Sequence, residues 1–246
     1  MSDSKIHRSG DKLIKTYLSD TYEYVELAYL RQKFVYDAGL PVPAVFGVSK
    51  VNEKETAIEM EYIDGEPLVS IYEGKSPEML TEAIRIMVRL QCQINAVDAS
   101  PLPDLTDFYA HEITTTPYLT EELKEILLAL MKKLDKGKTN LCHGDIHPHN
   151  IMVNGDKYWI IDWEEASKGD PAADACMSYF YSVRWSAKLN DRGAEQYLQI
   201  FCEESGIPKE DIFAWLPVIA GVQVNINDES DRVFISRFID EWHRKL

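Results

Sequence analysis

The chain has 246 residues, of which 45% are hydrophobic and 27% are charged, a composition that excludes a disordered or fibrous protein. Its 41 acidic residues outnumber the 26 basic ones, and the formal net charge of −15 makes nucleic acids and anionic membranes poor partners. The start of the chain is polar, and its longest apolar stretch, residues 212–224, is too short to cross a bilayer. With four scattered cysteines, the chain is expected to be a cytoplasmic protein with reduced thiols.

In chain order, the first predicted elements are strands and one helix. The pattern predicts strands at 5–8, 12–18, 44–51 and 56–62, and a helix at 22–38. Gly10 falls in the turn between the first two strands and Gly39 ends the helix, because glycine adopts the backbone angles that turns and helix ends require. A small β-rich region is therefore expected at the start of the chain.

Helices are predicted for most of the remaining chain. Ser76-Pro77-Glu78 is typical of a helix start, with a capping hydroxyl, a proline in the first turn and an early acid, and Thr120 begins another helix in a similar way. The predicted helices lie at 76–97, 120–134, 174–187, 192–205, 208–225 and 230–245. Their apolar stripes indicate core packing, so this region serves mainly as a scaffold.

The segment from His143 to Glu164 holds the most informative pattern. Asp145 precedes Asn150 by five residues, and Asp162 follows two short apolar runs that are separated by Asn154-Gly155, a strong hairpin signal. A tight hairpin would make Asn150 and Asp162 neighbours. In kinases this spacing supplies a carboxylate that accepts the proton of a substrate hydroxyl, and then an amide and a carboxylate that bind magnesium. The pattern thus predicts phosphoryl transfer from a nucleotide.

With His143-Gly144-Asp145, Asn150, Ile161-Asp162-Trp163-Glu164 and Gly169 to Asp174, the chain resembles the aminoglycoside phosphotransferase and choline kinase superfamily. The resemblance implies an α+β, two-lobed protein-kinase-like fold. A shortened β-rich N-terminal lobe at 1–64 would bind the nucleotide, and a mainly helical lobe at 65–246 would hold the catalytic and substrate sites. It also implies ATP and Mg²⁺ as cofactors and a small-molecule hydroxyl as acceptor. The acidic composition suits a cationic acceptor such as an amino sugar or an amino alcohol.

The resemblance assigns roles within the pattern. Asp145 matches the catalytic base, and Asn150 and Asp162 match the magnesium ligands. Asp174 matches a residue that braces the catalytic loop, and Gly144 is expected to let the backbone turn sharply before Asp145.

The nucleotide site is expected in the β-rich region. Lys15 matches the lysine that contacts the phosphates, with Lys12 as the fallback. Glu26 on the first helix matches the acid that pairs with this lysine, and Glu23 is the alternate.

The segment from Ile58 to Gly65 resembles the hinge between the lobes of a kinase. By this resemblance, the carbonyl of Glu61 and the amide of Ile63 meet the adenine edge, and Met60 guards the adenine pocket.

Two other interpretations stay open. Only fourteen residues precede Lys15, so the first strand of the family and its phosphate-covering loop are expected to be missing, and the chain would then be a degenerate kinase that binds nucleotide without transfer. Alternatively, His143, Asp145, His147 and His149 alternate and would present zinc ligands. Candidates for contacts to a cationic substrate are Trp163, Glu164, Glu165, Tyr179, Tyr181, Trp185 and Trp242.

Overall fold

The computed structural model describes residues 3–189, 192–225 and 229–244. The chain divides into two compact units. The first contains the residues up to Met79 together with Pro148–Ala166, and the second contains Leu80–His147 and the residues from Ser167 onward. The first unit is built on strands and the second mainly on helices.

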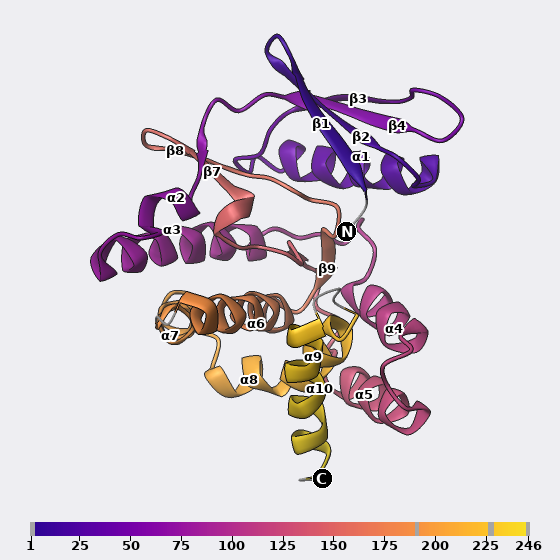
Figure 1. Ribbon diagram of the computed structural model, residues 1–246, viewed down its shortest axis with the longest axis vertical. Coiled ribbons are helices and arrows are strands. Elements are labelled where there is room, and N and C mark those ends of the chain that lie inside the picture. Colours follow the sequence, from indigo (N-terminus) through magenta and orange to yellow (C-terminus); the bar gives the residue numbers. More distant parts are fainter. Residues whose placement is uncertain (1–2, 190–191, 226–228, 245–246) are drawn as a thin grey trace. The chain divides into compact units, whose positions relative to one another are not determined.

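The first unit contains an antiparallel sheet of four strands in the order β1-β2-β4-β3 (Figure 1). The strands are β1 (Ser4–Ser9), β2 (Lys12–Tyr17), β3 (Val45–Lys50) and β4 (Thr56–Glu61). Helix α1 (Tyr22–Asp37) covers one face of this sheet. The core between them is formed by Tyr17, Val25, Ala28, Ile58 and Met60. The predicted strands and helix are confirmed, and their ends differ from the prediction by at most one residue.

Local chemistry sets the ends of these elements. The Thr21 hydroxyl caps α1 by accepting a hydrogen bond from the Tyr24 amide at 3.3 Å. Gly39, with φ of 82°, follows the helix, and Gly10, with φ of 66°, forms the turn between β1 and β2. Both glycines were predicted at these positions because the left-handed backbone is costly for other residues.

A hairpin of β7 (Ile151–Asn154) and β8 (Lys157–Ile160) completes the first unit, and β5 (Glu66–Pro67) pairs with β7. A short helix, α2 (Val69–Tyr72), follows β5, and a 3₁₀ turn at Pro148–Asn150 precedes β7. Gly155 stands at the first central position of the hairpin turn with φ of 58°, as two-residue hairpin turns require. The predicted Asn-Gly hairpin is therefore confirmed.

The compact units differ from the predicted division at 1–64 and 65–246. The hairpin lies far along the sequence, yet it belongs to the first unit, because its backbone is bonded to segments near the start of the chain. The Leu68 amide donates to the Ile151 carbonyl at 2.7 Å, and the Ile160 amide donates to the Pro41 carbonyl at 2.7 Å. Such long-range pairings leave no mark on local sequence patterns, so a single boundary along the chain did not capture the division.

The second unit is mainly helical and contains a two-stranded pairing of β6 (Asn140–Cys142) with β9 (Ser167–Gly169). Its helices are α3 (Pro77–Asn95, which begins in the first unit), α4 (Leu105–Thr115), α5 (Glu121–Leu134), α6 (Pro171–Leu189), α7 (Gly193–Ser205), α8 (Lys209–Ala214), α9 (Leu216–Gln223) and α10 (Glu229–His243). The prediction missed α4, β6 and β9. It also joined α8 and α9 into one helix, whereas the structure breaks them at Trp215, next to Pro217.

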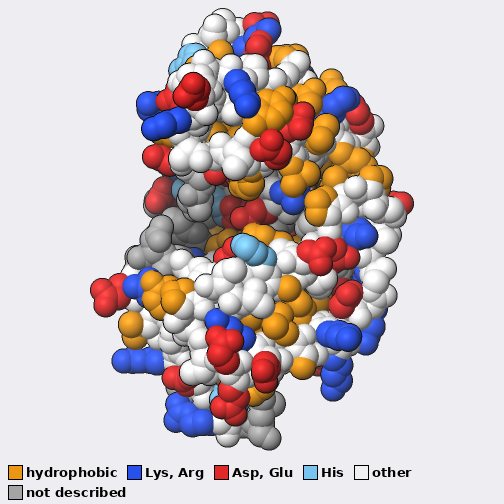
Figure 2. Space-filling view, turned by 90° about the vertical axis from the view of Figure 1, so that its right-hand side faces the viewer, with side chains coloured by type: hydrophobic (Ala, Val, Ile, Leu, Met, Phe, Trp, Pro, Cys, Tyr) orange, Lys and Arg blue, Asp and Glu red, His pale blue; other side chains and the backbone are white. Residues whose placement is uncertain are grey.

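The surface agrees with the acidic composition. Figure 2 shows Asp and Glu side chains interspersed with Lys, Arg and apolar side chains over the visible face. Among the described residues, no helix combines the length and the apolar character that a membrane span needs. All four cysteines are free.

Candidate nucleotide and phosphoryl-transfer site

The two predicted magnesium ligands lie side by side at the base of the β7–β8 hairpin. Ile151 pairs with Ile160 at the end of the ladder, and the next backbone bond runs from the Ile161 amide to the Asn150 carbonyl at 2.9 Å. Asp162 follows directly. The hairpin register thus brings an amide and a carboxylate together, and oxygen donors of this kind are the ligands that magnesium prefers.

Asp162 also has an unusual backbone. Its φ of 68° makes it the single non-glycine residue with positive φ in the described part of the chain. Aspartate tolerates this left-handed conformation better than most residues, but it still costs free energy, and such strain is concentrated at functional sites. The backbone turns here at the point where β8 ends, and the turn places the carboxylate against Lys15.

Lys15 on β2 is the cation of this site. Its ammonium lies 3.1 Å from Oδ1 of Asp162 and 2.5 Å from Oε1 of Glu164. Burial by itself would lower the pKa of Lys15, but the carboxylates of Asp162 and Glu164 outweigh burial and raise it. Lys15 therefore stays charged. Lys12, the fallback, pairs with Glu59 and does not line the pocket described next.

The sequence prediction that Glu26 pairs with Lys15 is wrong in this structure. The buried face of α1 is formed by Val25, Ala28, Gln32 and Val35, so Glu26 stands beside this face. Its carboxylate accepts a hydrogen bond from the hydroxyl of Tyr22, one turn earlier. Burial raises the pKa of Tyr22, and the nearby charge of Glu26 raises it further. In the described residues, the carboxylates paired with Lys15 come from the segment after β8, not from α1.

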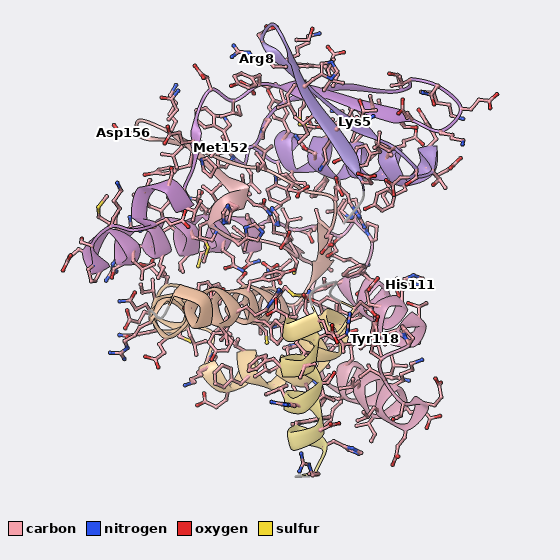
Figure 3. All side chains as sticks on the ribbon, viewed as in Figure 1. Lys5, Arg8, His111, Tyr118, Met152 and Asp156 are labelled. Atoms are coloured by element: carbon pink, nitrogen blue, oxygen red, sulfur yellow. The ribbon has the colours of Figure 1, made fainter. Side chains whose placement is uncertain are left out.

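One pocket of the first unit gathers the other predicted nucleotide residues. It is a cavity of ≈ 190 Å³ whose walls include Lys15, Met60, Glu61, Ile63 and Asp162. Its further lining is mostly apolar, with Gln32 on α1 and Glu164 after β8 as polar members; Figure 3 labels one of the apolar residues, Met152 on β7. An apolar cavity with a few convergent polar groups is the usual form of a small-molecule site. Glu26 is not part of its lining.

The backbone at the start of the predicted hinge is bonded to segments on both sides of β4. The Tyr62 amide donates to the Asp11 carbonyl at 3.0 Å, next to β2. The Glu61 amide donates to the Ala44 carbonyl at 2.8 Å. The Ala44 amide in turn donates to the Glu61 carboxylate at 3.2 Å rather than to its carbonyl. Glu61 and Ile63 both line the pocket, so the adenine contacts predicted for them stay a prediction with the two residues at the right place.

The turn between β1 and β2 is fastened to the same hinge segment. Besides the backbone bond from Tyr62 to Asp11, the guanidinium of Arg8 lies 3.9 Å from the centre of the Tyr62 ring, and its Nε donates to the Gly10 carbonyl at 2.8 Å. Figure 3 labels Arg8 near this turn. Gly10 is the single glycine of the turn, so this hairpin holds the hinge and is not a glycine-rich loop.

Asp145 belongs to the second unit, in the loop that follows β6. Gly144, just before it, has φ of 83°, as predicted for a sharp turn, and the Asp145 amide donates to Nδ1 of the buried His143 at 3.2 Å. Oδ1 of Asp145 lies 3.5 Å from Nε2 of His147. The side chain is 21% exposed, so this carboxylate remains accessible to solvent.

A buried network holds this loop. Oδ1 of Asp174, a residue that is 1% exposed, accepts from the Gly144 amide at 2.9 Å. Its Oδ2 accepts from the side-chain amides of Gln91 at 3.1 Å and Asn95 at 3.0 Å, and the Tyr197 hydroxyl donates to Oε1 of Gln91 at 2.8 Å. Asp174 thus fastens the Gly144 turn to α3, which is the bracing contact that the sequence resemblance implied.

Comparison with known proteins identifies the family. A family model described as "Phosphotransferase enzyme family" matches residues 9–212, well over half of the chain. The chain belongs to this phosphotransferase enzyme family.

Among curated proteins, this phosphotransferase-family chain is similar to acyl-CoA dehydrogenase family member 10 of Mus musculus. The two are 24% identical over an alignment of 230 residues, and the match covers 76% of this chain and 21% of the relative. The chain spans about a fifth of the length of the curated relatives it matches, so each similarity concerns one part of the relative.

Two solved structures show the same fold. A type VIII aminoglycoside-3'-phosphotransferase is 15% identical with a TM-score of 0.66, and the match covers 90% of this chain and 89% of that one. The aminoglycoside phosphotransferase APH(3'')-Id from Streptomyces rimosus, solved with ADP and streptomycin, is 18% identical with a TM-score of 0.64, and the match covers 87% of both chains. The predicted α+β, protein-kinase-like fold of this phosphotransferase-family member is therefore confirmed.

The alternative of a zinc site finds no support in the phosphotransferase-family structure. Within residues 3–189, 192–225 and 229–244, no group of three or more His, Cys, Asp or Glu side chains is placed to hold a metal ion. His143 is fully buried and its Nδ1 accepts a backbone hydrogen bond, while His147 packs edge-on against Tyr181 with ring centres 5.9 Å apart. These two histidines serve the structure of the loop.

The residues predicted to contact a cationic substrate lie in different surroundings. Trp163 is 1% exposed and its indole donates to the Ile160 carbonyl at 2.9 Å, so it belongs to the core. Tyr179 packs at a tilted angle against Phe213, with ring centres 5.2 Å apart. The side chain of Trp185 lies outside the described residues.

The residues of the site that sequence reasoning missed include Tyr17 and Arg31. Both contact Glu164: the Tyr17 hydroxyl donates to Oε1 at 2.5 Å, and Arg31 donates to its backbone carbonyl. Tyr17 stands two positions after Lys15 on β2, so the alternation of the strand placed it on the same face, but its apolar ring suggested only a core residue.

Proposed function

We propose that this chain transfers the terminal phosphate of ATP to a hydroxyl group of a small molecule. The observation that carries the proposal is the contact of Lys15 with Asp162 at the wall of a pocket whose lining also includes the hinge residues Glu61 and Ile63. A phosphate-binding cation, a metal-binding carboxylate and an adenine-binding backbone are the parts that phosphoryl transfer requires. Family membership supports the same reaction class.

The residues present fit a magnesium ion. Asn150 and Asp162 offer an amide oxygen and a carboxylate from adjacent positions at the hairpin base, and magnesium accepts one or two protein ligands when phosphates supply others. Bound magnesium would neutralise charge on the phosphates. The strained backbone of Asp162 supports this role, because strained conformations are concentrated at functional sites, where the direction of a side chain matters.

Asp145 is proposed as the group that orients the acceptor hydroxyl and takes its proton. A carboxylate is the appropriate base, and Asp145 is partly exposed in a loop braced by Asp174. Five residues of chain connect Asp145 to Asn150, which limits the distance between their Cα atoms to about 18 Å even when fully extended. The chain itself therefore limits how far Asp145 can lie from Asn150.

The acceptor is proposed to be a cationic small molecule. The net charge of −15 attracts cations. The related structure from Streptomyces rimosus was solved with streptomycin, and another, of the aminoglycoside phosphotransferase APH(4)-Ia, with hygromycin B. Because identity to these proteins is below one fifth, they suggest a class of compound and no particular one.

The first experiment is to measure nucleotide binding and then ATP consumption by the purified protein with a panel of hydroxyl compounds. The panel should contain aminoglycosides, macrolides, choline, ethanolamine and neutral sugars. Consumption of ATP that depends on one acceptor, with a phosphorylated product found by mass spectrometry, supports the proposal. Absence of nucleotide binding in the presence of magnesium contradicts it.

A specific observation favours a second candidate, a nucleotide-binding module without transfer. The β1–β2 turn contains one glycine and is tied to Tyr62, so in the described residues this hairpin does not form a flexible loop over the pocket. Saturable ATP binding combined with no consumption across the whole panel distinguishes the module from the enzyme.

The metal site gives a separate prediction. Asp162→Asn removes one negative charge from the magnesium ligand and from the ion pair with Lys15, so the magnesium concentration that gives half-maximal nucleotide binding should rise by about tenfold, equivalent to about 1.4 kcal/mol. The measurement is a magnesium titration of ATP binding. Asp156→Asn, at the tip of the same hairpin in Figure 3, should leave the titration unchanged. Equal responses of the two variants would exclude Asp162 as a ligand.

A further inference from the structure

We propose that Glu164 is the residue that positions Lys15, with Tyr17 and Arg31 holding Glu164 in place. The inference rests on the proposed function, because it concerns the lysine that would contact the nucleotide phosphates. It replaces the pair that the sequence resemblance implied, between Lys15 and an acid on α1. Glu164 acts through Lys15, so it is a positioning residue.

The contact between Lys15 and Glu164 is short and largely removed from water. Their side chains are 16% and 15% exposed, and the ammonium lies 2.5 Å from Oε1 of Glu164. The second partner of Lys15, Asp162, is 39% exposed and its Oδ1 lies 3.1 Å away. Asp162 and Glu164 both attract Lys15, and the Glu164 contact is the shorter and the better shielded from water, so it holds the ammonium in a fixed place.

Glu164 is itself held at three of its oxygen atoms. The Tyr17 hydroxyl donates to Oε1 at 2.5 Å, the Tyr24 hydroxyl donates to Oε2 at 3.4 Å, and Arg31 donates to the backbone carbonyl. Burial, followed by the charge of Glu164, raises the pKa of Tyr17 well above its usual range, so this hydroxyl remains a donor at every physiological pH. The carboxylate of Glu164 is therefore fixed in the site before any nucleotide binds.

Helix α1 contributes to this arrangement in a different way from the one expected. Its side chains toward Glu164 are a tyrosine, Tyr24, and a cation, Arg31, rather than an acid. Burial lowers the pKa of Arg31, while nearby Tyr24, Glu165 and Glu164 oppose this effect. Helix α1 thus helps to hold Glu164, which belongs to the segment after β8, and does not itself supply the acid that pairs with Lys15.

This geometry has a consequence for the metal ligand. Lys15 is shared between Asp162 and Glu164, and a carboxylate that binds magnesium must give up part of its contact with a lysine. Glu164 keeps Lys15 paired when Asp162 turns to the metal. Without the charge of Glu164, Asp162 would be the remaining carboxylate of the two, and its pairing with Lys15 would compete with magnesium.

The test compares Glu164→Gln with Glu26→Gln on the same full-length protein. The affinity for a fluorescent ATP analogue is measured over a range of magnesium concentrations. Glu164→Gln keeps the size and the hydrogen-bonding ability of the side chain but removes its charge. It should weaken analogue binding by about tenfold and raise the magnesium concentration for half-maximal binding by a similar factor. Glu26→Gln, whose side chain contacts Tyr22, should bind like the unmodified protein.

A second pair of variants tests how Glu164 is held. Tyr17→Phe removes the hydroxyl that donates to Oε1 and should weaken analogue binding by about threefold, the effect of one hydrogen bond. Tyr36→Phe changes an exposed tyrosine of α1 and should have no effect. Thermal unfolding of each variant shows whether it remains folded. If Glu164→Gln or Tyr17→Phe unfolds, Glu164→Asp, which shortens the reach to Lys15, replaces it and should also weaken binding.

The outcomes separate this inference from the proposed function. If the unmodified protein does not bind the analogue, the proposed function fails. If it binds and Glu164→Gln binds equally well with an unchanged magnesium requirement, or if the loss occurs in Glu26→Gln instead, the assignment of Glu164 is overturned. Weaker binding with an unchanged magnesium requirement overturns it as well, because a purely structural role would produce that result.

Discussion

Replacing Asp145 by asparagine should lower the turnover number for phosphate transfer by about 10²–10⁴, the usual contribution of a positioned general base. The substitution keeps the shape of the side chain and the hydrogen bond from the backbone amide of residue 145 to Nδ1 of His143, but it removes the negative charge that would take the proton of the acceptor hydroxyl. Steady-state kinetics with the acceptor found in the panel provide the measurement.

The affinity for ATP should stay unchanged in this variant, because Asp145 does not line the pocket that contains Lys15 and the hinge residues. Asp156→Asn is a suitable control, since this acid lies at the tip of the hairpin. A turnover number for Asp145→Asn within a factor of two of the unmodified protein would contradict the assignment of Asp145 as base.

Replacing Asp174 by alanine should lower the free energy of unfolding of the second unit by about 3–5 kcal/mol. The reason is that three buried donors would lose the Asp174 carboxylate as acceptor at a site where Asp174 is 1% exposed: the Gly144 amide and the side-chain amides of Gln91 and Asn95, which would keep only their bonds to Ser178 and Leu141. A loss of this size is a large share of the stability of a typical domain. Urea unfolding followed by circular dichroism is the measurement.

Asp170→Ala is the matched control. Asp170 lies four residues earlier, and its Oδ1 accepts from the Ala172 amide at 2.9 Å and from Lys138 at 2.8 Å at the start of α6. Loss of such a helix cap costs about 1 kcal/mol. Equal destabilisation by the two substitutions would show that the Gly144 brace contributes no more than a cap.

Much of the fold could be predicted because its signals are local. The turn at Gly10, the cap at Thr120 and the Asn154-Gly155 hairpin each depend on neighbouring residues, and each occurs in the structure as predicted. The short β6–β9 pairing and helix α4 were missed, since β6 and β9 have three residues each and too few positions to show a period.

The candidate site also has parts that local sequence predicted and parts that it did not. The neighbouring positions of Asn150 and Asp162 followed from the hairpin register, which the sequence encodes locally. The partner of Lys15 did not follow, because Glu164 lies 149 residues away in the sequence and nothing near Lys15 indicates which of several acids reaches it. The resemblance suggested an acid on α1. The packing of Val25 and Ala28 against the sheet left Glu26 beside Tyr22 instead.

The left-handed backbone at residue 162 also bears on how this protein responds to selection. Glycine adopts that conformation freely, whereas aspartate does so at a cost. A laboratory evolution experiment that rewards heat resistance alone would therefore be expected to enrich Asp162→Gly, which relaxes the chain and discards a carboxylate. Selection for growth that depends on the enzyme would remove the same variant. The residue found at position 162 after selection would therefore show whether heat resistance or enzyme activity had been selected.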